Sequence, residues 1–578
     1  MRYREKKYKF IFYVQGVTFK LIDTATSSLK IRRTKIIATL GPASSEFGQI
    51  KDLINAGVNI FRQNFSHGDH KYHEETYLKI RKAAKELDKT ISILADLCGP
   101  KIRTGKFEND KIELINDQSV VVTTRDVIGN SNLIPSQYKE LAKDIEIGNR
   151  ILLADGTLEL KVNEINDTEI KCTVVYGGVL GNHKGINLPG VNVSAPSLTE
   201  KDKEDAKLAL ELGVDFLALS FVRSASDIYD LKKLVEENSC NGQIIAKIEK
   251  PEALEDAKEI IKAADGIMVA RGDLGVELNP EQVPVAQHQL IDLARKKFKP
   301  VIVATQMLES MIENARPTRA EVTDVAYAVT LGTDAIMLSG ETAVGAFPVD
   351  AVKMMDRIAR QTEIYLWTNN VYGSKISSNA SKVAIPVWDA VANSMSRLAQ
   401  DLKVRAVVVI SKSGATAATM SSARPAAPII AITKTINVCQ RILMYWGVVP
   451  ILSESKIKIL MKPKKAFLKN SARDLYWQRF QEFDGKTMLE LEMSITESVP
   501  SQPKTGKLAG KTEPLSGWVN FFKKEGLIKI IEEKDPAVVA RNVVIKEKLA
   551  SAGQKILLVQ GFQSDDALNK PSVTVLTI

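Results

Sequence analysis

Long apolar runs and paired cysteines are both missing from this chain of 578 residues. No run is long enough to cross a bilayer, and the short apolar stretch Phe10–Val14 lacks the small-residue cleavage site of a signal peptide. We therefore expect no membrane segment. Cys98, Cys172, Cys240 and Cys439 form no C-x-x-C pair, which argues against a disulfide framework or a zinc site. This cysteine usage predicts a reducing, cytoplasmic compartment.

The chain also lacks an acidic excess, since its formal net charge is +10, a value that invites a nucleic-acid partner. Residues 1–35 carry a net +8 and residues 456–469 a net +6, so removing both from the total leaves −4 for the rest. Basic segments at the periphery are more often solvated surface than a binding stripe. We therefore expect no nucleic-acid partner, and we predict that residues 1–30 form a disordered extension.

From residue 33 onward the chain repeats one pattern: a short β-branched run ends in polar or glycine residues, and an amphipathic helix follows. Runs that are apolar throughout indicate strands buried on both faces of a parallel sheet. Eight such β/α units imply a closed (β/α)8 barrel, a TIM barrel, rather than an open sheet. The predicted strands are Thr34–Leu40, Val58–Asn64, Ile91–Leu97, Phe216–Phe221, Ile244–Ile248, Gly266–Ala270, Val301–Thr305 and Ala335–Leu338.

Two regions depart from the barrel pattern. Between the third and fourth predicted strands, short alternating segments such as Ser119–Thr124 and Ile170–Tyr176 predict a small inserted β-barrel that acts as a lid. Near the end of the chain, strands such as Ala406–Ile410 and Val573–Thr577 predict an open α/β sheet. The predicted domains are the barrel at 31–104 and 197–365, the lid at 105–196, and a C-terminal effector-type domain at 366–578 with an atypical segment at 456–535.

Charged and hydroxyl side chains gather at the carboxyl ends of the predicted strands, where a β/α barrel carries its active site. They are Arg62, Asp96, Lys247, Glu249, Asp273 and Thr305. Lys247 and Glu249 are two residues apart on one strand, so both point to the same face. Glu249 with Asp273 from the adjacent strand suits a Mg²⁺ ion that keeps several waters. Lys247 beside that ion can neutralise a transferring phosphoryl group or an enolate.

Each of these residues also has a structural alternative. Lys247 and Glu249 can form an ion pair on the barrel rim, and Asp273 can cap the turn that Gly272 and Gly275 flank. The structural explanation would have to hold at five strand ends together. Buried charges must be paired or bind ions, so we favour a site.

Strings around these strand ends closely resemble the pyruvate kinase family. The resemblance spans roughly residues 33–453, and a weaker resemblance covers residues 536–578. It implies transfer of the phosphoryl group of phosphoenolpyruvate to ADP, giving pyruvate and ATP, the final step of glycolysis. It also implies Mg²⁺ or Mn²⁺ as cofactor and a homotetramer. The strings are Asn64–Gly68, Asp96–Thr104, Ala246–Glu249, Met268–Gly275, Ala304–Met311 and Met337–Thr342.

The resemblance implies a role for each strand-end residue. Arg62 and Lys247 would hold the phosphoryl group, with Lys247 stabilising the transition state. Thr305, with the backbone at Gly272 and Asp273, would hold the substrate carboxylate, and a water ordered by Thr305 is one route for protonating the enolate. The metal would be bound by Glu249 and Asp273, and the nucleotide by Asn64, Phe65, Ser66, His67, Arg103 and Lys184.

The monovalent-cation site departs from the family pattern. The implied ligands are Asn64, Ser66, Asp96 and the backbone of Leu97. Members that depend on K⁺ carry Glu at the position where this chain has Lys101. We therefore hypothesise that the Lys101 ammonium supplies the positive charge and that K⁺ is dispensable.

A hydroxyl-rich loop follows a strand in the third domain: Ser411, Lys412, Ser413, Gly414, Ala415 and Thr416. Its backbone and hydroxyl donors can cradle a phosphate, so a phosphorylated allosteric effector is a candidate ligand. An ordinary helix N-terminus is the alternative. The glycine-rich effector loop of the family is not recognisable in residues 561–570.

Two rival functions stay open on the sequence alone. A metal-dependent pyruvate aldolase on the same barrel would share the metal carboxylates, but it would not need the lid, Arg103 or Lys184. A non-catalytic relative that binds metabolites or RNA would fit the basic segments. Against that reading, every residue predicted to be catalytic is present.

Overall fold

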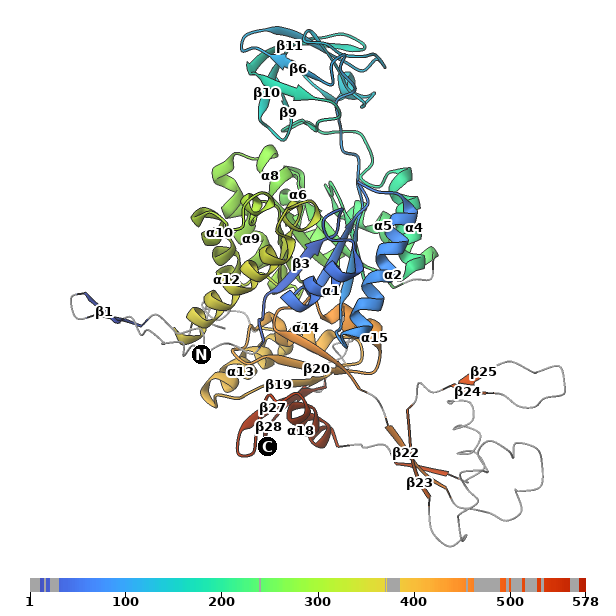
Figure 1. The fold of residues 1–578 in the computed structure, drawn as a ribbon, viewed down its shortest axis with the longest axis vertical. Helices are drawn as coiled ribbons and strands as arrows, with labels where there is room; N and C mark the ends of the chain where they lie inside the picture. The colour runs from blue at the N-terminus through green and yellow to red at the C-terminus, as the bar shows by residue number, and fades with distance from the viewer. Residues whose placement is uncertain are drawn as a thin grey trace, which may run out of the picture. The chain divides into compact units, whose positions relative to one another are not determined.

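A computed structural model describes residues 31–238, 241–369, 371, 385–453, 535–561 and 571–578, together with the backbone of short strands elsewhere (Figure 1). The chain forms two compact units. The first comprises residues 1–397, 417–428 and 440–448, and the second comprises residues 398–416, 429–439 and 449–578.

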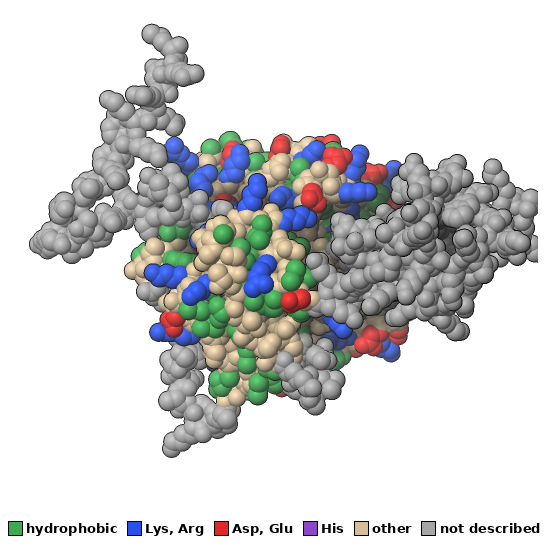
Figure 2. All heavy atoms as spheres, turned by 90° about the horizontal axis from the view of Figure 1, so that it is seen from below, with side chains coloured by type: hydrophobic (Ala, Val, Ile, Leu, Met, Phe, Trp, Pro, Cys, Tyr) green, Lys and Arg blue, Asp and Glu red, His purple; other side chains and the backbone are tan. Residues whose placement is uncertain are grey.

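Three features of the described residues concern membrane helices, surface charge and cysteines. Over those residues, no helix is both long enough and apolar enough to span a membrane. On the face drawn in Figure 2, the coloured Lys and Arg side chains are interspersed with hydrophobic, acidic and uncharged ones. Cys98, Cys172 and Cys439 are free thiols, whereas Cys240 lies outside the described residues.

Eight parallel strands in the first unit close into a barrel, which confirms the predicted TIM barrel. Going round the barrel, the order is β14-β15-β16-β17-β18-β3-β4-β5. Each strand overlaps one predicted run. The bounds are β3 (Lys35–Thr39), β4 (Ile60–Asn64), β5 (Ser92–Asp96), β14 (Phe216–Leu219), β15 (Gln243–Ile248), β16 (Gly266–Ala270), β17 (Val301–Ala304) and β18 (Ala335–Leu338).

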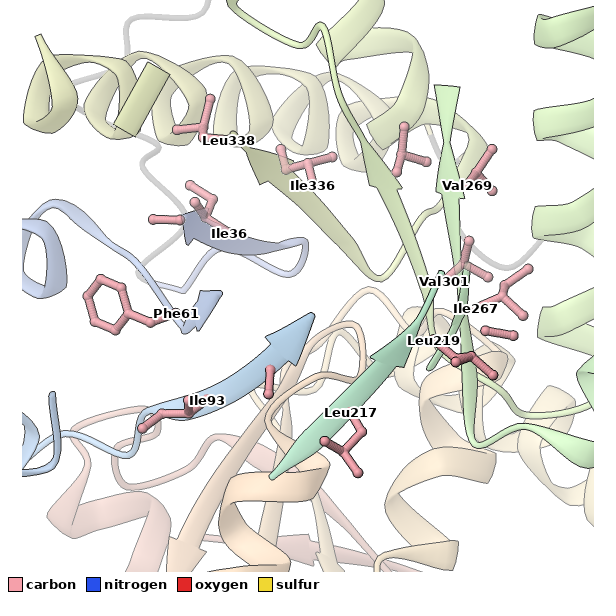
Figure 3. Packing of buried hydrophobic residues seen from close by; sticks show 14 of the residues in the cluster. Ile36, Phe61, Ile93, Leu217, Leu219, Ile267, Val269, Val301, Ile336 and Leu338 are labelled. Carbon is pink, nitrogen blue, oxygen red and sulfur yellow. The ribbon is translucent and has the colours of Figure 1, made fainter. Parts of the chain in front are cut away.

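Alternate residues along each barrel strand belong to two different buried layers. Ile36 and Phe61 pack outside the strands, against the surrounding helices (Figure 3). Their neighbours Ile37 and Ile60 instead fill the barrel interior. Because both faces of every strand are buried, the runs read as apolar throughout, as a parallel sheet requires.

Helices connect the barrel strands and end where the sequence provides caps. Thr199 and Thr318 each form a capping box at a helix start, and glycines in the left-handed conformation end the same two helices. The helices are α1 (Phe47–Ala56), α2 (His70–Glu86), α4 (Glu200–Leu212), α5 (Ala225–Glu237), α6 (Pro251–Glu255), α7 (Ala257–Ala263), α8 (Arg271–Glu277), α9 (Val283–Lys296), α10 (Arg319–Leu331), α11 (Gly340–Ala343) and α12 (Pro348–Thr368).

The amphipathic pattern after β15 predicts one helix over Ala253–Ala263, but the structure divides this segment into α6 and α7. The break falls at Asp256, whose φ of −93° and ψ of 13° leave the helical range. Its carboxylate accepts a hydrogen bond from the backbone N–H of Ala225 at 2.8 Å, at the start of α5. This long-range contact explains why helical periodicity alone did not predict the break.

The insertion between β5 and β14 is an all-β domain with its own core, which includes Val122, Leu160 and Cys172. Its six-stranded sheet has the order β13-β9-β10-β11-β7-β8, and a second sheet pairs β12 with β6. The strand order is open at β13 and β8, so the domain is a half-barrel rather than a closed barrel. The bounds are β6 (Lys111–Leu114), β7 (Ser119–Thr123), β8 (Leu133–Pro135), β9 (Arg150–Leu153), β10 (Leu158–Ile165), β11 (Glu169–Tyr176), β12 (Gly178–Gly181) and β13 (Ile186–Asn187), with a short helix α3 (Leu141–Asp144).

The second unit contains the predicted open α/β sheet. Its strand order is β21-β20-β19-β27-β28, and β28 is antiparallel to β27. Helices lie between the strands in sequence. The elements from this part of the chain are α13 (Val387–Asp401), β19 (Val407–Ile410), α14 (Ala415–Ser422), β20 (Ile429–Thr433), α15 (Ile436–Ile442), β21 (Val448–Leu452), α18 (Pro536–Lys546), β27 (Lys555–Gln560) and β28 (Ser572–Thr577). By residue number, α13, α14, α15 and β21 are divided between the two units.

Three predictions fall largely outside the described residues: the disordered extension at 1–30, the atypical segment at 456–535, and the loop at 561–570. Within them the structure gives only strand backbone, Asp535 and Gly561. The strands are β1 (Ile11–Val14), β2 (Val17–Lys20), β22 (Lys456–Met461), β23 (Leu489–Ser494), β24 (Ser498–Pro500), β25 (Thr512–Pro514) and β26 (Ile528–Ile531).

We expect Asp334→Ala to destabilise the barrel by about 3–5 kcal/mol, because it leaves a buried charge without its partner. Asp334 is 2% exposed and accepts hydrogen bonds from the Arg424 guanidinium at 2.8 Å and the Trp446 backbone at 2.9 Å. Hydrogen exchange at the amides of β17 and β18 measures the loss locally. Lys171→Ala, which removes the exposed pair with Glu164, is the control and changes stability by at most about 1 kcal/mol. Equal effects of the two variants would contradict this account.

Candidate active site

Side chains at the carboxyl ends of neighbouring strands meet at one mouth of the barrel. Asn64 at the end of β4 is in register with Asp96 at the end of β5. Lys247, near the end of β15, is in register with Met268 of β16, the strand that leads into Asp273. The parallel arrangement thus puts chemistry-bearing residues from separate segments of the chain at one place.

The Lys247 ammonium lies at the centre of this cluster. It donates to the Ser220 hydroxyl at 2.6 Å and lies 3.0 Å from Glu249 Oε1 and 3.2 Å from Asp96 Oδ1. These three contacts match its three N–H donors. Burial lowers the pKa of Lys247, but the Asp96 and Glu249 carboxylates outweigh that effect, so the pKa is raised overall and the side chain stays charged.

The buried Asp96 carboxylate is held by two cations. Its Oδ2 accepts from Arg62 Nε at 2.6 Å, while its Oδ1 faces Lys247. Burial raises the pKa of Asp96, but the charges of Lys247 and Arg62 lower it by more, so the carboxylate is ionised. Arg62 also donates to the Thr39 hydroxyl at 3.1 Å, which fixes the direction of the guanidinium.

Glu249 and Asp273 are the two carboxylates that suit a divalent ion. Glu249 accepts from the backbone N–H of Phe221 at 2.7 Å, and Asp273 faces the Lys101 ammonium at 3.3 Å. Burial raises the pKa of Glu249; Lys247 lowers it and the like charge of Asp273 raises it again, leaving it raised overall. A divalent cation relieves both the burial cost and this repulsion, so the donor set fits such an ion. Among the described residues no larger ligand cluster of His, Cys, Asp and Glu forms, which leaves the remaining positions to water and substrate oxygens.

The anion-binding segment after β16 differs in one detail from the sequence expectation. The backbone N–H of Gly272, expected to be free, donates to the Thr305 hydroxyl at 2.7 Å. Thr305 has a φ of 69°, an uncommon value for a β-branched residue, and Arg271 supports it by donating to its carbonyl at 2.8 Å. A substrate carboxylate that takes the Gly272 N–H would therefore displace Thr305 Oγ1.

The residues expected at the nucleotide lie on both sides of the mouth. Phe65 is 2% exposed and stacks on His73, so only its backbone is at the site. The pKa of His67 is lowered by burial and then by the charges of Arg103, Arg62 and Lys101, so these cations all act at one place. Asn64 accepts from the backbone N–H of Ser66 at 3.2 Å.

Arg103 lies on the chain segment that leads from the barrel into the inserted domain, and Lys184 lies between β12 and β13 of that domain. Arg103 forms a β-bridge with Gly185, and Thr104 donates its backbone N–H to the Lys184 carbonyl at 2.8 Å. The two predicted nucleotide residues, far apart in sequence, are therefore next to each other in space.

The residues expected to hold a monovalent cation are divided among several contacts. Asp96 is already paired with Arg62 and Lys247, and the Leu97 carbonyl accepts from the Ser220 hydroxyl at 2.6 Å. Lys101 faces Asp273 rather than Asp96. The structure thus places the Lys101 charge on the side of the divalent-ion carboxylates.

Sequence reasoning missed three side chains that orient this cluster: Ser220, Thr39 and Arg271. The first two follow or end a barrel strand, but their uncharged hydroxyls do not stand out in the sequence as the charged strand-end residues do. Arg271 was noted only as part of a glycine-containing string, whereas it binds the Asp324 carboxylate at 2.6 Å and the Thr305 carbonyl.

The hydroxyl-rich loop of the second unit lies between β19 and α14. Gly414 has a φ of 97°, and its backbone N–H donates to the Ser411 hydroxyl at 3.0 Å. Ala415 and Thr416 begin α14, and the Ala415 N–H faces the Ser413 hydroxyl at 3.4 Å. Lys412 and Ser413 are exposed, whereas Ser411 and Thr416 are buried.

Comparison with known proteins agrees with this geometry. The family model "Pyruvate kinase, barrel domain" matches residues 31–352, and "Pyruvate kinase, alpha/beta domain" matches residues 389–473. Pyruvate kinase 2 of Synechocystis is 45% identical over 425 residues, covering 73% of this chain and 71% of its own. The pyruvate kinase of Geobacillus stearothermophilus is 46% identical over 420 residues, covering 72% and 71%.

A solved structure gives the same result. The crystal structure of a pyruvate kinase from Cryptosporidium parvum matches with a TM-score of 0.72 and 34% identity, covering 94% of this chain and 96% of that one. The rival aldolase and non-catalytic readings therefore fall away. The chain belongs to the pyruvate kinase family, whose members typically use a divalent cation, and it transfers the phosphoryl group of phosphoenolpyruvate to ADP.

Proposed function

We propose that this reaction takes place at the mouth formed by Arg62, Lys247, Glu249, Asp273 and Thr305. The observation that carries the proposal is the position of Lys247, whose buried ammonium touches Ser220, Glu249 and Asp96 together. An ammonium fixed in this way is a preorganised positive charge for a phosphoryl group.

Lys247 and Arg62 hold the phosphoryl group while an oxygen of ADP attacks phosphorus and the bond to the enolate oxygen breaks. Catalysis of such a transfer consists mainly of positioning and charge stabilisation. Asp96 and Thr39 support that task because they fix the Arg62 guanidinium before substrate arrives. Little reorganisation is then needed in the transition state.

Glu249 and Asp273 would hold Mg²⁺ or Mn²⁺. When bound, the ion supplies positive charge to the phosphoryl and enolate oxygens. Glu249 is oriented by the Phe221 backbone N–H, and the Asp273 carboxylate, which contacts the Lys101 ammonium, would be the second ligand.

The substrate carboxylate is held by the backbone at Gly272 and Asp273 and by the Thr305 hydroxyl. Thr305 also orders the water that protonates the leaving enolate, since its hydroxyl is both a donor and an acceptor at this place. The nucleotide is contacted by Asn64, Phe65, Ser66, His67, Arg103 and Lys184. Arg103 comes from the segment that enters the inserted domain, and Lys184 comes from the domain itself, next to the bridge between Arg103 and Gly185.

Lys101 supplies a permanent positive charge to the mouth in place of K⁺. Its charge acts on His67, and its ammonium lies 3.3 Å from Asp273. Further proposals rest on family resemblance: a homotetramer, and a phosphorylated effector at residues 411–416. A cytoplasmic location stays a prediction from the cysteine pattern.

We expect Lys247→Met to lower kcat by about 100- to 1,000-fold or more, because the phosphoryl oxygens lose their fixed positive charge. A lactate-dehydrogenase-coupled assay with phosphoenolpyruvate, ADP and Mg²⁺ measures the loss. Lys161→Met, the same change on an exposed lid strand, should retain the wild-type rate. Comparable rates for both variants would refute the assignment.

We expect Glu249→Gln and Asp273→Asn each to weaken Mn²⁺ binding by about tenfold or more, since each removes a charged ligand. Electron paramagnetic resonance titration without substrate reports free Mn²⁺ directly, independent of turnover. Glu259→Gln, on the exposed face of α7, is the control. Unchanged binding in the two site variants would remove the metal assignment.

We expect the wild-type chain to work equally well in tetramethylammonium and K⁺ buffers. Lys101→Glu should lower the rate in tetramethylammonium, and K⁺ should restore much of it, because the lost positive charge is then supplied by the ion. Lys143→Glu, on an exposed lid helix, should gain no K⁺ dependence. Strong K⁺ stimulation of the wild-type chain would contradict the role of Lys101.

A further inference from the structure

Three buried polar side chains outside the proposed catalytic set join the inserted domain to the barrel. Glu277 Oε1 accepts from Lys250 Nζ at 2.7 Å and from Asn187 Nδ2 at 3.1 Å. Asn187 is 5% exposed, Glu277 6% and Lys250 9%. A buried polar group that loses its hydrogen-bond partner costs free energy, so each of these contacts affects how the two parts are held together.

Each member of this cluster lies on a segment that matters for the reaction. Asn187 lies on β13, which pairs with β9, so the residue is part of the lid sheet. Lys250 directly follows Glu249 in sequence. Glu277 is the last residue of α8, the short helix whose first turn carries Asp273. The cluster therefore ties the lid to both segments that bear the proposed metal carboxylates.

The cluster is only partly satisfied. Asn187 Oδ1 and Glu277 Oε2 are buried and have no hydrogen-bond partner among the described residues. Asn187 and Lys250 also line a cavity with residues of the barrel and of the inserted domain, so these acceptors lie where the two parts meet. A contact that is specific but incomplete can form and break as a lid moves.

We propose that Asn187 is a positioning residue that sets the lid against the barrel through Glu277 and Lys250. The inference rests on the proposed nucleotide role of Arg103 and Lys184, which lie beside each other where the chain enters the inserted domain. Residues Lys184 and Asn187 are three apart, and the backbone N–H of Ile186 donates to the Ile102 carbonyl at 2.9 Å. A shift of Asn187 therefore moves Arg103 and Lys184 relative to the barrel.

The charge of the cluster provides a direct test. In the wild-type chain one buried carboxylate, Glu277, faces one ammonium, Lys250. Asn187→Asp adds a second carboxylate beside Glu277, and two buried like charges repel strongly. Combining it with Glu277→Gln restores one carboxylate per ammonium and keeps an amide on the other side.

We expect Asn187→Asp to raise the KM for ADP by about tenfold, which corresponds to about 1.4 kcal/mol, and to change the KM for phosphoenolpyruvate much less. The double variant Asn187→Asp/Glu277→Gln should bring the KM for ADP back to within about threefold of wild type. Asn163→Asp makes the same change at an exposed position of β10 and should leave both constants unaltered.

Hydrogen exchange gives a second readout that does not depend on turnover. The amides of Thr104 and Ile186 bond across the connecting segments, so they should exchange faster in Asn187→Asp and recover in the double variant. A failure of the double variant to restore either readout would overturn the proposal, as would an equal effect of Asn163→Asp. Lys247→Met, measured alongside, distinguishes a failure of the proposed function from a failure of this inference. It tests the catalytic assignment, and it should leave the exchange rates of the Thr104 and Ile186 amides unchanged.

Discussion

The whole site depends on one buried carboxylate. Asp96 is 1% exposed, and an ionised group in such a position must be paired. Arg62 and Lys247 provide that pairing from the two sides, and each is thereby fixed at the place where we propose that the phosphoryl group binds. The interaction that stabilises the folded mouth is thus the same one that preorganises it. Burying the charge of Asp96 costs free energy, and the pairing that offsets this cost also fixes the positions of the two cations.

The barrel is what allows this arrangement, and its strands were predictable for the same reason. Runs such as Ile36–Ala38 are apolar because both strand faces are buried, one against helices and one inside the barrel. Burial of both faces is a local constraint that applies to each of the eight strands, so it is visible in the sequence as apolar runs. Because the strand interiors are apolar, the charged residues lie at the strand ends. The spacing of two residues between Lys247 and Glu249 then predicted that both side chains lie on the same strand face.

What escaped prediction depends on contacts between distant segments. Ser220 has no charge to mark it, yet its hydroxyl links Lys247 to the Leu97 carbonyl. The break at Asp256 follows from a hydrogen bond to a different helix. The pairing of Lys101 with Asp273 joins residues 172 apart in sequence, and spacing alone predicted only that Lys101 lay near the mouth. Sequence periodicity predicts the helices and strands and which of their faces are buried. The hydrogen-bond partners of individual polar atoms depend on the three-dimensional fold.

The charges at the mouth nearly cancel before substrate arrives. Lys247, Arg62 and Lys101 lie against Asp96, Glu249 and Asp273, each carboxylate facing at least one cation. Phosphoenolpyruvate and ADP are both strongly anionic, so their binding makes the net charge of the mouth negative unless a cation binds with them. A divalent ion does so at the two carboxylates that already repel each other. The charge inventory of the mouth therefore favours such an ion beside Glu249 and Asp273, where one carboxylate is buried and the other lies 3.3 Å from the Lys101 ammonium.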